Sequence, residues 1–591
     1  MAKTKAKRKT ANQRRKKKKV NVKAIILLVI AVLIALIIVA AIITVITVMG
    51  KRKAPTQELT DLKYYYNLSA NASEGRKTAE DDELAIVFED EILTERAFIS
   101  DSEAYIRLAL VRENIDSRFY FDSNEQVLIV TDAQKAMTVY MGQTYYTSGN
   151  DQVNTDYTIL TERNGEIYVA MDFVSDYSSA YYSIYDDPAR IVITYAVGEK
   201  TFCDAKKTTQ IRVLGGVKAE VVGTVDSGAK LLVLDDLDDW LEVVSPEGWK
   251  GYVATSAVGD QYTEYVESDY DEPEYTSMNM GAKVKLGWAS IDNDDGNDEY
   301  SNFTADSDGI MNVYCPTWYA LEDGSGTIDN LSDSSYVERA HSDGYQVWAM
   351  FADKSADYAE PVLTHTSTRI RVEDEIINDL LAKGIDGLNV DFEHINSWYG
   401  DDYLQFLREL SIKCREKGLY FSVDNYAPYD YNACYHIEEQ STLCDYVFLM
   451  AYDDYVGSGS VGPNSSLTFI REVVDLTLSK VANSNKVVVG LPFYSRVWST
   501  SEDGELSRKE YTMSNAWSLM QEVGEDPEWD SESGTWYTEY TINGTTYDAW
   551  LEDEETIREK LNLVSEYDVA GVAFWCLGQE FSVVWDVVAQ Y

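Results

Sequence analysis

Cysteine is scarce in this sequence, and no two cysteines have the spacing of a metal or redox motif. The scarcity excludes a dense disulfide framework, and the spacing excludes a Cys-X-X-Cys site. A disulfide between Cys434 and Cys444 stays open, but buried free thiols are the favoured interpretation. The six positions are Cys203, Cys315, Cys414, Cys434, Cys444 and Cys576.

Acidic residues are absent from the first 50 positions, although 100 follow. Residues 1–23 hold twelve Lys or Arg, and residues 24–49 carry no charge. A helix of that length, at about 1.5 Å per residue, spans a bilayer core of about 30 Å with some tilt. The shorter apolar region and small-residue cleavage site of a signal peptide are not evident. We therefore predict a transmembrane anchor at 24–49 with a basic cytoplasmic tail at 1–23.

Positive charge is scarce in the rest of the chain. The 39 Lys and Arg after residue 50 face 100 Asp and Glu, which gives that part a net charge of −61. Such a surface repels anionic polymers, so we expect no nucleic-acid partner. The basic tail alone would suggest nucleic-acid binding, but the adjoining apolar run explains it as a topology signal. The prediction is a single-pass cell-membrane protein with an extracellular body.

An internal repeat follows a polar stalk at 51–80. The segments YIRLALVRENIDSRFYFDSNEQVLIVTD (105–132) and YVAMDFVSDYSSAYYSIYDDPARIVITY (168–195) align without gaps. We interpret 81–200 as a duplicated α+β or mostly-β module. It resembles the N-terminal domain of copper amine oxidases, a module of bacterial surface proteins. The resemblance implies no copper here, because residues 81–200 contain no histidine.

Short strand patterns separated by turns occupy residues 207–259. Trp240 and the Gly-Tyr-Val sequence at 251–253 resemble a bacterial Src-homology-3-like barrel. Modules of that kind often bind cell-wall peptides, which implies a possible peptide partner; a plain spacer barrel is the alternative interpretation. Residues 260–281 form an acidic linker to the C-terminal domain.

Apolar strand patterns alternate with helical patterns from residue 282 to residue 591. Eight candidate strands in about 300 residues predict a parallel sheet closed into a (β/α)8 TIM barrel. Residues 494–570 are too long for one helix and contain TWYTEYTINGTTYDAW, which predicts a hairpin with an Asn-Gly turn in a small α+β insertion. The predicted fold class is therefore α/β, preceded by the small β-barrel, the duplicated module and the transmembrane helix. The eight strands are VKLGWAS, MNVYCPTWY, QVWAMFA, GLNVDFE, YFSVDNYA, YVFLMAYD, VVVGLPF and GVAFWCLG.

The fourth of these strands, within DGLNVDFEHI (386–395), carries polar side chains in an apolar run. On a strand, Asn389, Asp391 and Glu393 point to one side and the apolar residues to the other. The apolar set packs on helices, so we expect the polar set to face the barrel interior near its C-terminal, active-site end. Asp386 lies farthest from that end and is expected to be structural.

Four motifs resemble glycoside hydrolase family 18, the chitinase family. DGLNVDFE is similar to its DxxDxDxE signature, MAYD (450–453) to MxYD, and GLPFYSRVW (490–498) to GLPxYGRxW. GVAFWCLG places Trp575 at the eighth-strand tryptophan of the family. A fifth segment, PTWY (316–319), is similar to the second strand of the branch that contains spore-cortex-lytic enzymes.

The resemblance implies substrate-assisted, retaining hydrolysis of β-1,4 bonds in N-acetylglucosamine glycans, without metal or cofactor. Glu393 is then the general acid. Asp391 holds the acetamido N–H and Tyr452 its oxygen. The implied substrate-binding residues are Asn389, Met450, Asp453, Trp575, Tyr494, Arg496 and Trp318.

Asn389 departs from the Asp that many chitinases have at this position. Asn cannot share a proton or negative charge with Asp391, and the peptidoglycan-acting branch commonly has Asn here. The resemblance therefore favours peptidoglycan, with chitin possible. Two alternatives stay open: a catalytically silent glycan-binding cell-wall protein, and an interaction scaffold whose upstream modules carry the function. A calcium site in IDNDDGNDEY (291–300) is disfavoured, because Ile291 and Gly296 break the EF-hand spacing.

Overall fold

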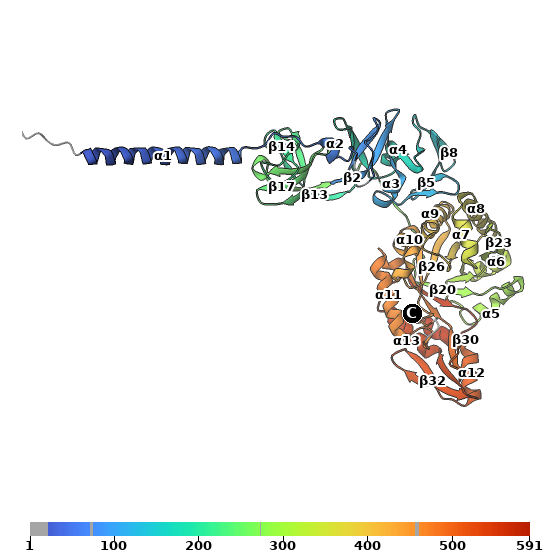
Figure 1. The fold of residues 1–591 in the computed structure, drawn as a ribbon. Helices are drawn as coiled ribbons and strands as arrows, with labels where there is room; N and C mark the ends of the chain where they lie inside the picture. Colours follow the sequence, from blue (N-terminus) through green and yellow to red (C-terminus); the bar gives the residue numbers. More distant parts are fainter. Residues whose placement is uncertain (1–21, 71–74, 272, 456–459) are drawn as a thin grey trace, which may run out of the picture. The chain divides into compact units, whose positions relative to one another are not determined.

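The computed structural model describes residues 22–70, 75–271, 273–455 and 460–591. The chain divides into two compact units: Met1–Arg96 with Tyr182–Glu267, and Ala97–Tyr181 with Ser268–Tyr591. Figure 1 shows the element order along the chain.

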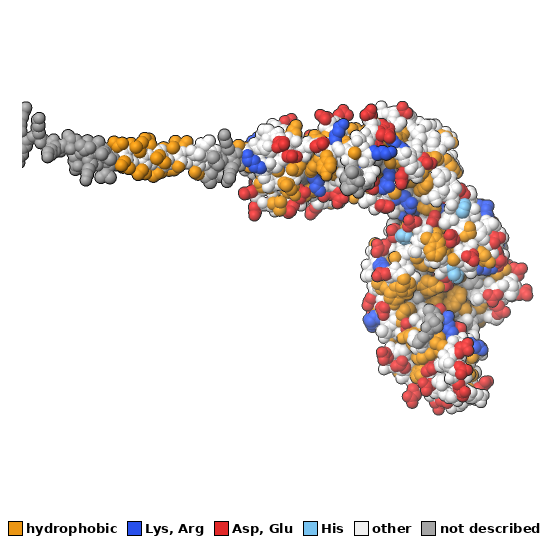
Figure 2. Space-filling model, viewed as in Figure 1, with side chains coloured by type: hydrophobic (Ala, Val, Ile, Leu, Met, Phe, Trp, Pro, Cys, Tyr) orange, Lys and Arg blue, Asp and Glu red, His pale blue; other side chains and the backbone are white. Residues whose placement is uncertain are grey.

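The first unit begins with the long helix α1 (Val22–Lys53). Its stretch Val29–Thr47 has a mean hydropathy of 3.5 and no buried side chain, and Figure 2 shows its apolar surface. The hydroxyls of Thr44 and Thr47 donate to carbonyls four residues back, which satisfies the only polar side chains of this stretch. A helix of this length and composition is sufficient to cross a bilayer.

A seven-stranded antiparallel sheet forms most of the remainder of the first unit, in the order β15-β14-β18-β17-β16-β13-β19. Gly251 in β18 has φ +153°, and a Cβ there would lie 2.3 Å from the carbonyl oxygen of Arg212. Only glycine therefore allows β14 and β18 to approach at this point. The strands are β13 (Gly198–Asp204), β14 (Thr209–Arg212), β15 (Val221–Val225), β16 (Lys230–Asp236), β17 (Trp240–Val244), β18 (Lys250–Ala254) and β19 (Tyr262–Val266).

The two copies of the sequence repeat have the same element order: strand, short helix, then two strands. The first copy contains β3 (Glu103–Arg107), α3 (Leu108–Asn114), β4 (Phe119–Asp122) and β5 (Val127–Thr131). The second contains β10 (Glu166–Ala170), α4 (Met171–Asp176), β11 (Tyr181–Tyr185) and β12 (Arg190–Thr194). The first copy continues into a five-stranded antiparallel meander, β4 to β8, that belongs to the second unit. Its last three strands are β6 (Ala136–Tyr140), β7 (Tyr145–Ser148) and β8 (Asp151–Asn154).

Within the second unit, the first copy contacts the N-terminus of helix α8 (Thr366–Lys383). The backbone N–H and the hydroxyl of Thr366 each donate to Asp122 Oδ2 at 2.7 Å. The N–H of Ser367 donates to Glu125 at 3.1 Å. The first amides of a helix lack partners inside the helix, so these carboxylates satisfy them from outside.

The C-terminal part of the second unit is a closed eight-stranded parallel barrel, which confirms the predicted TIM barrel and all eight predicted strands. The sheet runs β21-β20-β34-β28-β27-β26-β25-β24, and pairing of β21 with β24 closes it. The strands are β20 (Val284–Ala289), β21 (Val313–Pro316), β24 (Gln346–Ala352), β25 (Gly387–Asp391), β26 (Tyr420–Asn425), β27 (Tyr446–Met450), β28 (Val487–Pro492) and β34 (Gly571–Trp575).

Helices between the strands cover the outside of the barrel. Gly384 and Gly418, both with positive φ near 70°, end α8 and α9 in the left-handed conformation that glycine accepts. The larger helices are α6 (Ser334–Asp343), α7 (Ala356–Leu363), α8, α9 (Gly400–Lys417), α11 (Leu467–Lys480) and α13 (Glu554–Val564).

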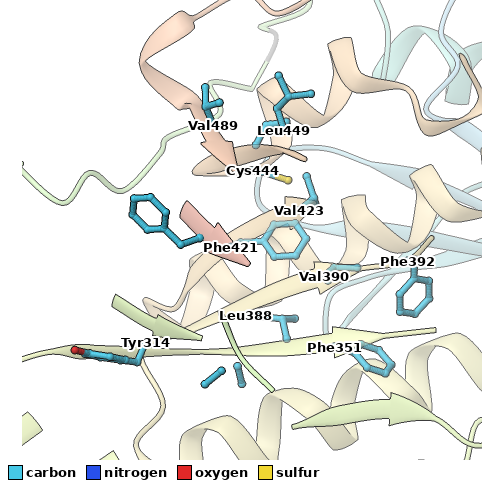
Figure 3. Close-up of a cluster of buried hydrophobic side chains, with 14 of the residues drawn as sticks. Tyr314, Phe351, Leu388, Val390, Phe392, Phe421, Val423, Cys444, Leu449 and Val489 are labelled. Atoms are coloured by element: carbon cyan, nitrogen blue, oxygen red, sulfur yellow. The ribbon is translucent and has the colours of Figure 1, made fainter. Parts of the chain in front are cut away.

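Side-chain alternation separates two apolar cores. Leu388 and Val390 of β25 point outward, with Phe421 and Val423 of β26, into the core beneath the helices (Figure 3). A smaller core fills the barrel interior, with Leu286, Trp288, Met350, Phe448 and Val488 among its members. The two polar residues of β25, Asn389 and Asp391, belong to neither core and face the interior.

The predicted insertion is a five-stranded antiparallel sheet with helix α12 (Met513–Val523). Its hairpin turns at Asn543 and Gly544, which both have positive φ, as a type I′ turn requires. The predicted Asn-Gly hairpin is confirmed. The strands are β29 (Tyr494–Thr500), β30 (Leu506–Thr512), β31 (Glu528–Asp530), β32 (Thr535–Ile542) and β33 (Thr545–Leu551).

Candidate active site

Strand β25 ends at Asp391, so Glu393 lies in the following loop rather than on the strand. Asp353, after β24, holds this loop: its Oδ1 accepts the N–H of Glu393 at 2.8 Å, and its Oδ2 accepts that of His394 at 3.1 Å. Asp353 is itself buried. The Glu393 side chain is exposed at the C-terminal end of the barrel, where a substrate can reach it.

Asp391 is a buried carboxyl beside other acids. Its Oδ1 has no hydrogen-bond partner among the described residues. Burial, then the negative charges of Asp424 and Glu393, raises the pKa of Asp391 well above its ordinary value. An acid of this kind holds its proton until a positively charged or hydrogen-bond-donating group approaches.

Asn389 is fixed by hydrogen bonds on both sides of its amide. Its Oδ1 accepts the indole N–H of Trp288 at 3.0 Å. Its Nδ2 donates to Ser422 Oγ at 3.1 Å and to Asp424 Oδ1 at 2.7 Å. These partners assign the orientation of the amide and direct its donors toward β26. Asn389 therefore supports the site from beneath and is fully buried.

Two site residues, Asp424 and Tyr426, were missed by the sequence interpretation. Asp424 is 2% exposed, and burial raises its pKa well above the ordinary value. Tyr426 donates its hydroxyl to Glu393 Oε2. The alternation in YFSVDNYA was the available signal, because it places Ser422 and Asp424 on the same face as Asn389 and Asp391.

The MAYD residues follow β27 and converge with the start of β29. Tyr494 donates its hydroxyl to Asp453 Oδ1 at 2.7 Å, and Arg496 forms an ion pair with the same oxygen. Arg496 is 1% exposed and also donates to the carbonyl of Tyr455 at 2.8 Å. Arg496 is thus placed to orient Asp453. In the same motif, burial raises the pKa of Tyr452 well above its ordinary value and keeps that phenol neutral.

An aromatic surface lies under this group of polar residues. Trp575 ends β34 and is partly exposed, with its ring centroid 6.1 Å from that of Trp288. Met450 ends β27 and is 7% exposed. A partly exposed indole at the barrel mouth offers an apolar face to a sugar ring.

The structure does not bring Trp318 into this group. It is 1% exposed, donates its indole N–H to Asn297 at 2.8 Å and packs against Tyr336 beneath the outer helices. The expectation that it contacts substrate therefore lacks support from its position. Strand β21 ends at Pro316, two residues before Trp318, so the side-chain alternation of that strand does not extend to Trp318.

Asp386 lies at the opposite end of β25, where it accepts the N–H of Val347 and a bond from His341, both at 2.8 Å. Part of the acidic segment 291–300 forms a 3-10 helix, Asp294–Glu299. Within the described ranges, no three His, Cys, Asp or Glu side chains are arranged to hold a metal ion.

Several known proteins are similar to the C-terminal part of this chain. The model of glycosyl hydrolases family 18 matches residues 276–580, just over half of the chain. The uncharacterized glycosylase YvbX of Bacillus subtilis is 24% identical over 298 residues, 47% of this chain and 84% of that protein. The cortical fragment-lytic enzyme of Bacillus subtilis is 24% identical over 38% of this chain, which spans only 54% of that enzyme. The Bacillus cereus spore cortex-lytic enzyme SleL has a TM-score of 0.48 and 17% identity, over 56% of this chain and 76% of its own.

Proposed function

The chain belongs to glycosyl hydrolase family 18, and from that membership we propose that it is a membrane-anchored extracellular glycosidase. Its substrate is a β-1,4-linked glycan containing N-acetylglucosamine, with peptidoglycan favoured over chitin. The observation that carries the proposal is the pair formed by a buried Asp391, with one carboxylate oxygen unpartnered within the described residues, and an exposed Glu393 two residues later.

The proposed reaction is substrate-assisted and retaining. Glu393 protonates the glycosidic oxygen as the bond breaks. The acetamido oxygen of the substrate attacks the anomeric carbon, and Asp391 accepts the acetamido N–H and stabilises the positive charge that develops. Water, deprotonated by Glu393, then attacks the same carbon, reopens the ring and restores the proton of Glu393. Tyr452 donates a hydrogen bond to the acetamido oxygen. Trp575 lies beneath the same sugar.

Two observations favour peptidoglycan. Asn389 occupies the position at which many chitinases have Asp. One similar protein is named cortical fragment-lytic enzyme, although a Drosophila melanogaster protein named "Probable chitinase 2" is also similar, at 26% identity. We therefore propose a cell-wall glycan as the first substrate to test.

The upstream regions are proposed to hold the barrel at its substrate. Helix α1 serves as the anchor, with the basic tail in the cytoplasm and the catalytic domain outside the cell. The Src-homology-3-like region at 207–259 binds cell-wall peptides. The duplicated module at 81–200, similar to the N-terminal domain of copper amine oxidases, serves as a surface module.

The test uses the full chain in detergent, as wild type and as Glu393→Gln. Each is incubated with purified peptidoglycan and with chitin oligomers, and new reducing ends are identified by mass spectrometry. We expect N-acetylglucosamine reducing ends from peptidoglycan, reduced by at least about 10²-fold in the variant. Glu416→Gln is the control, because Glu416 is an exposed residue in the last turn of α9, just before β26 begins and so at the end of the barrel opposite the mouth.

The other outcomes choose between alternatives. Cleavage of chitin oligomers alone would reverse the substrate preference. Binding of either polymer without cleavage by the wild type would indicate a silent glycan-binding protein. Neither binding nor cleavage would refute the proposal and favour the interaction scaffold.

A further inference from the structure

Asp391 and Asp424 occupy neighbouring positions on two paired strands. Strands β25 and β26 are parallel, with Asn389 opposite Ser422 and Val390 opposite Val423. Asp391 and Asp424 are the next residues on each strand. Val390 and Val423 both point into the outer core, so alternation directs both carboxyls into the barrel, on strands about 4.8 Å apart.

No Lys or Arg among the described residues balances these two acids. Asp391 and Asp424 are 9% and 2% exposed, and neither forms an ion pair with Lys or Arg within the described residues. The polar contact to Asp424 is the neutral amide of Asn389 at 2.7 Å. Two buried carboxyls this close cannot both be ionised at low cost, so the pair holds one proton and one negative charge.

We propose that Asp424 is the charge partner of Asp391 in the reaction, so that the second carboxylate of the site lies on β26. Asn389 cannot take a proton, but it donates to Asp424 and holds that carboxyl in place. When the acetamido group binds, the shared proton rests on Asp424 and the negative charge on Asp391. The proton count of the pair does not change. Asp424 is a positioning residue, since it is almost wholly buried.

Other ionisable groups also face the pair. Glu393 and Asp353 follow β25 and β24, Tyr452 follows β27, and the Cys315 thiol of β21 donates to Asn389 Oδ1 at 3.5 Å. Burial raises the pKa of Cys315 and of Tyr452 well above their ordinary values, so both are neutral. The two remaining acids are present in every variant used below.

The test removes a carboxyl from β26, adds one to β25, or does both, by exchanging Asp and Asn, whose side chains have nearly the same volume. On the acidic limb of kcat/KM against pH, Asp391 gains a proton while Asp424 is already protonated. Asp424→Asn replaces the O–H donor of Asp424 by a weaker amide donor, so ionised Asp391 is less stabilised and the limb moves to higher pH. Asn389→Asp adds a second acid that can donate to Asp391, so that limb moves to lower pH. The double variant restores two carboxyls, and its limb returns toward that of the wild type. A residue with only a packing role would not produce shifts of opposite sign.

The rate at the pH optimum separates positioning from direct catalysis. Because Asp424 does not reach the glycan, kcat should fall by less than the roughly 10²-fold expected for a direct proton donor. An acidic limb unmoved in Asp424→Asn, with an active wild type, overturns the inference.

A second measurement does not depend on activity, although the inference rests on the proposed function. At neutral pH, where surface carboxyls are ionised, the protonated-carboxyl absorption in the infrared spectrum of the full chain should be weaker in Asp424→Asn and restored in the double variant. Other buried acids such as Glu373 contribute equally to all three spectra. An inactive wild type would refute the proposed function, whereas an unchanged band would refute the shared proton.

Discussion

Two groups of buried acids in the second unit differ in what surrounds them. At the barrel mouth, Asp391 and Asp424 have an amide and other acids as neighbours. Between α8 and α9, Glu409 receives two hydrogen bonds from the buried Arg369, at 2.7 and 3.0 Å. Burial alone would raise the pKa of Glu409, but the charge of Arg369 outweighs it and the pKa is lowered.

The difference separates acids that stabilise the fold from acids kept for chemistry. Glu409 is ionised and buried, forms an ion pair with Arg369, and accepts a further hydrogen bond from Gln405 at 2.9 Å. Asp391 keeps an oxygen without a partner in the described part of the chain. A buried carboxyl without a cation costs stability and is retained where a substrate supplies the missing partner.

The largest expected effect comes from removing the cation of the Arg369–Glu409 ion pair. Arg369→Met leaves Glu409 buried without its cation, which should lower the free energy of unfolding by about 3–5 kcal/mol. Thermal denaturation of the full chain measures the loss. Arg558→Met, at an exposed pair with Glu555, is the control and should cost at most about 1 kcal/mol. Equal losses in both variants would contradict the comparison.

Asp391→Asn should have the opposite result, a large loss of activity without a loss of stability. Losing the acetamido acceptor should reduce kcat by at least about 10²-fold, whereas the melting temperature should equal or exceed that of the wild type. Glycan cleavage and calorimetry on the same preparation measure both quantities. A variant that is inactive because it is unfolded would contradict this prediction.

The contributions of Asp391 and Glu409 to the free energy of unfolding should change with pH in opposite directions. The pKa of Asp391 is raised in the fold, so the folded state binds the extra proton and loses stability as pH rises above the ordinary value of 3.8. The advantage of Asp391→Asn should therefore grow with pH above about 4. The pKa of Glu409 is lowered, so its contribution is lost as pH falls below its ordinary value of 4.5. Urea unfolding across this range, with Arg369→Met as the second variant, tests both signs.

The smallest effect concerns the helix that carries Arg369. Asp122→Ala removes the acceptor of the Thr366 amide and hydroxyl, and should cost about 1 kcal/mol. Asp151→Ala, at an exposed position of β8 (Asp151–Asn154), is the control and should cost less than about 0.5 kcal/mol. No difference between the two unfolding curves would show that the cap is not needed.

The sequence predicts elements better than the contacts between them. Apolar runs located all eight barrel strands, and Asn543 with Gly544 located the hairpin, because these signals are local. Asp424 was missed because its importance comes from its register beside Asp391, which depends on strand pairing. The end of β25 at Asp391 was also missed, since the loop that follows is held by Asp353, 40 residues before Glu393 in sequence.

The capping of α8 by Asp122 and Glu125 has a consequence for how the protein is divided for expression. The region shared with the family begins at residue 276, but the compact unit begins at residue 97 and omits residues 182–267. A fragment that begins at the barrel would lack Asp122 and Glu125, so the first amides of α8 would lose their carboxylate partners. It would also lack the Tyr120 ring, which lies 5.1 Å from the Arg369 guanidinium. A fragment cut at residue 97 retains both, so cloning boundaries drawn from homology alone would remove part of the folding unit.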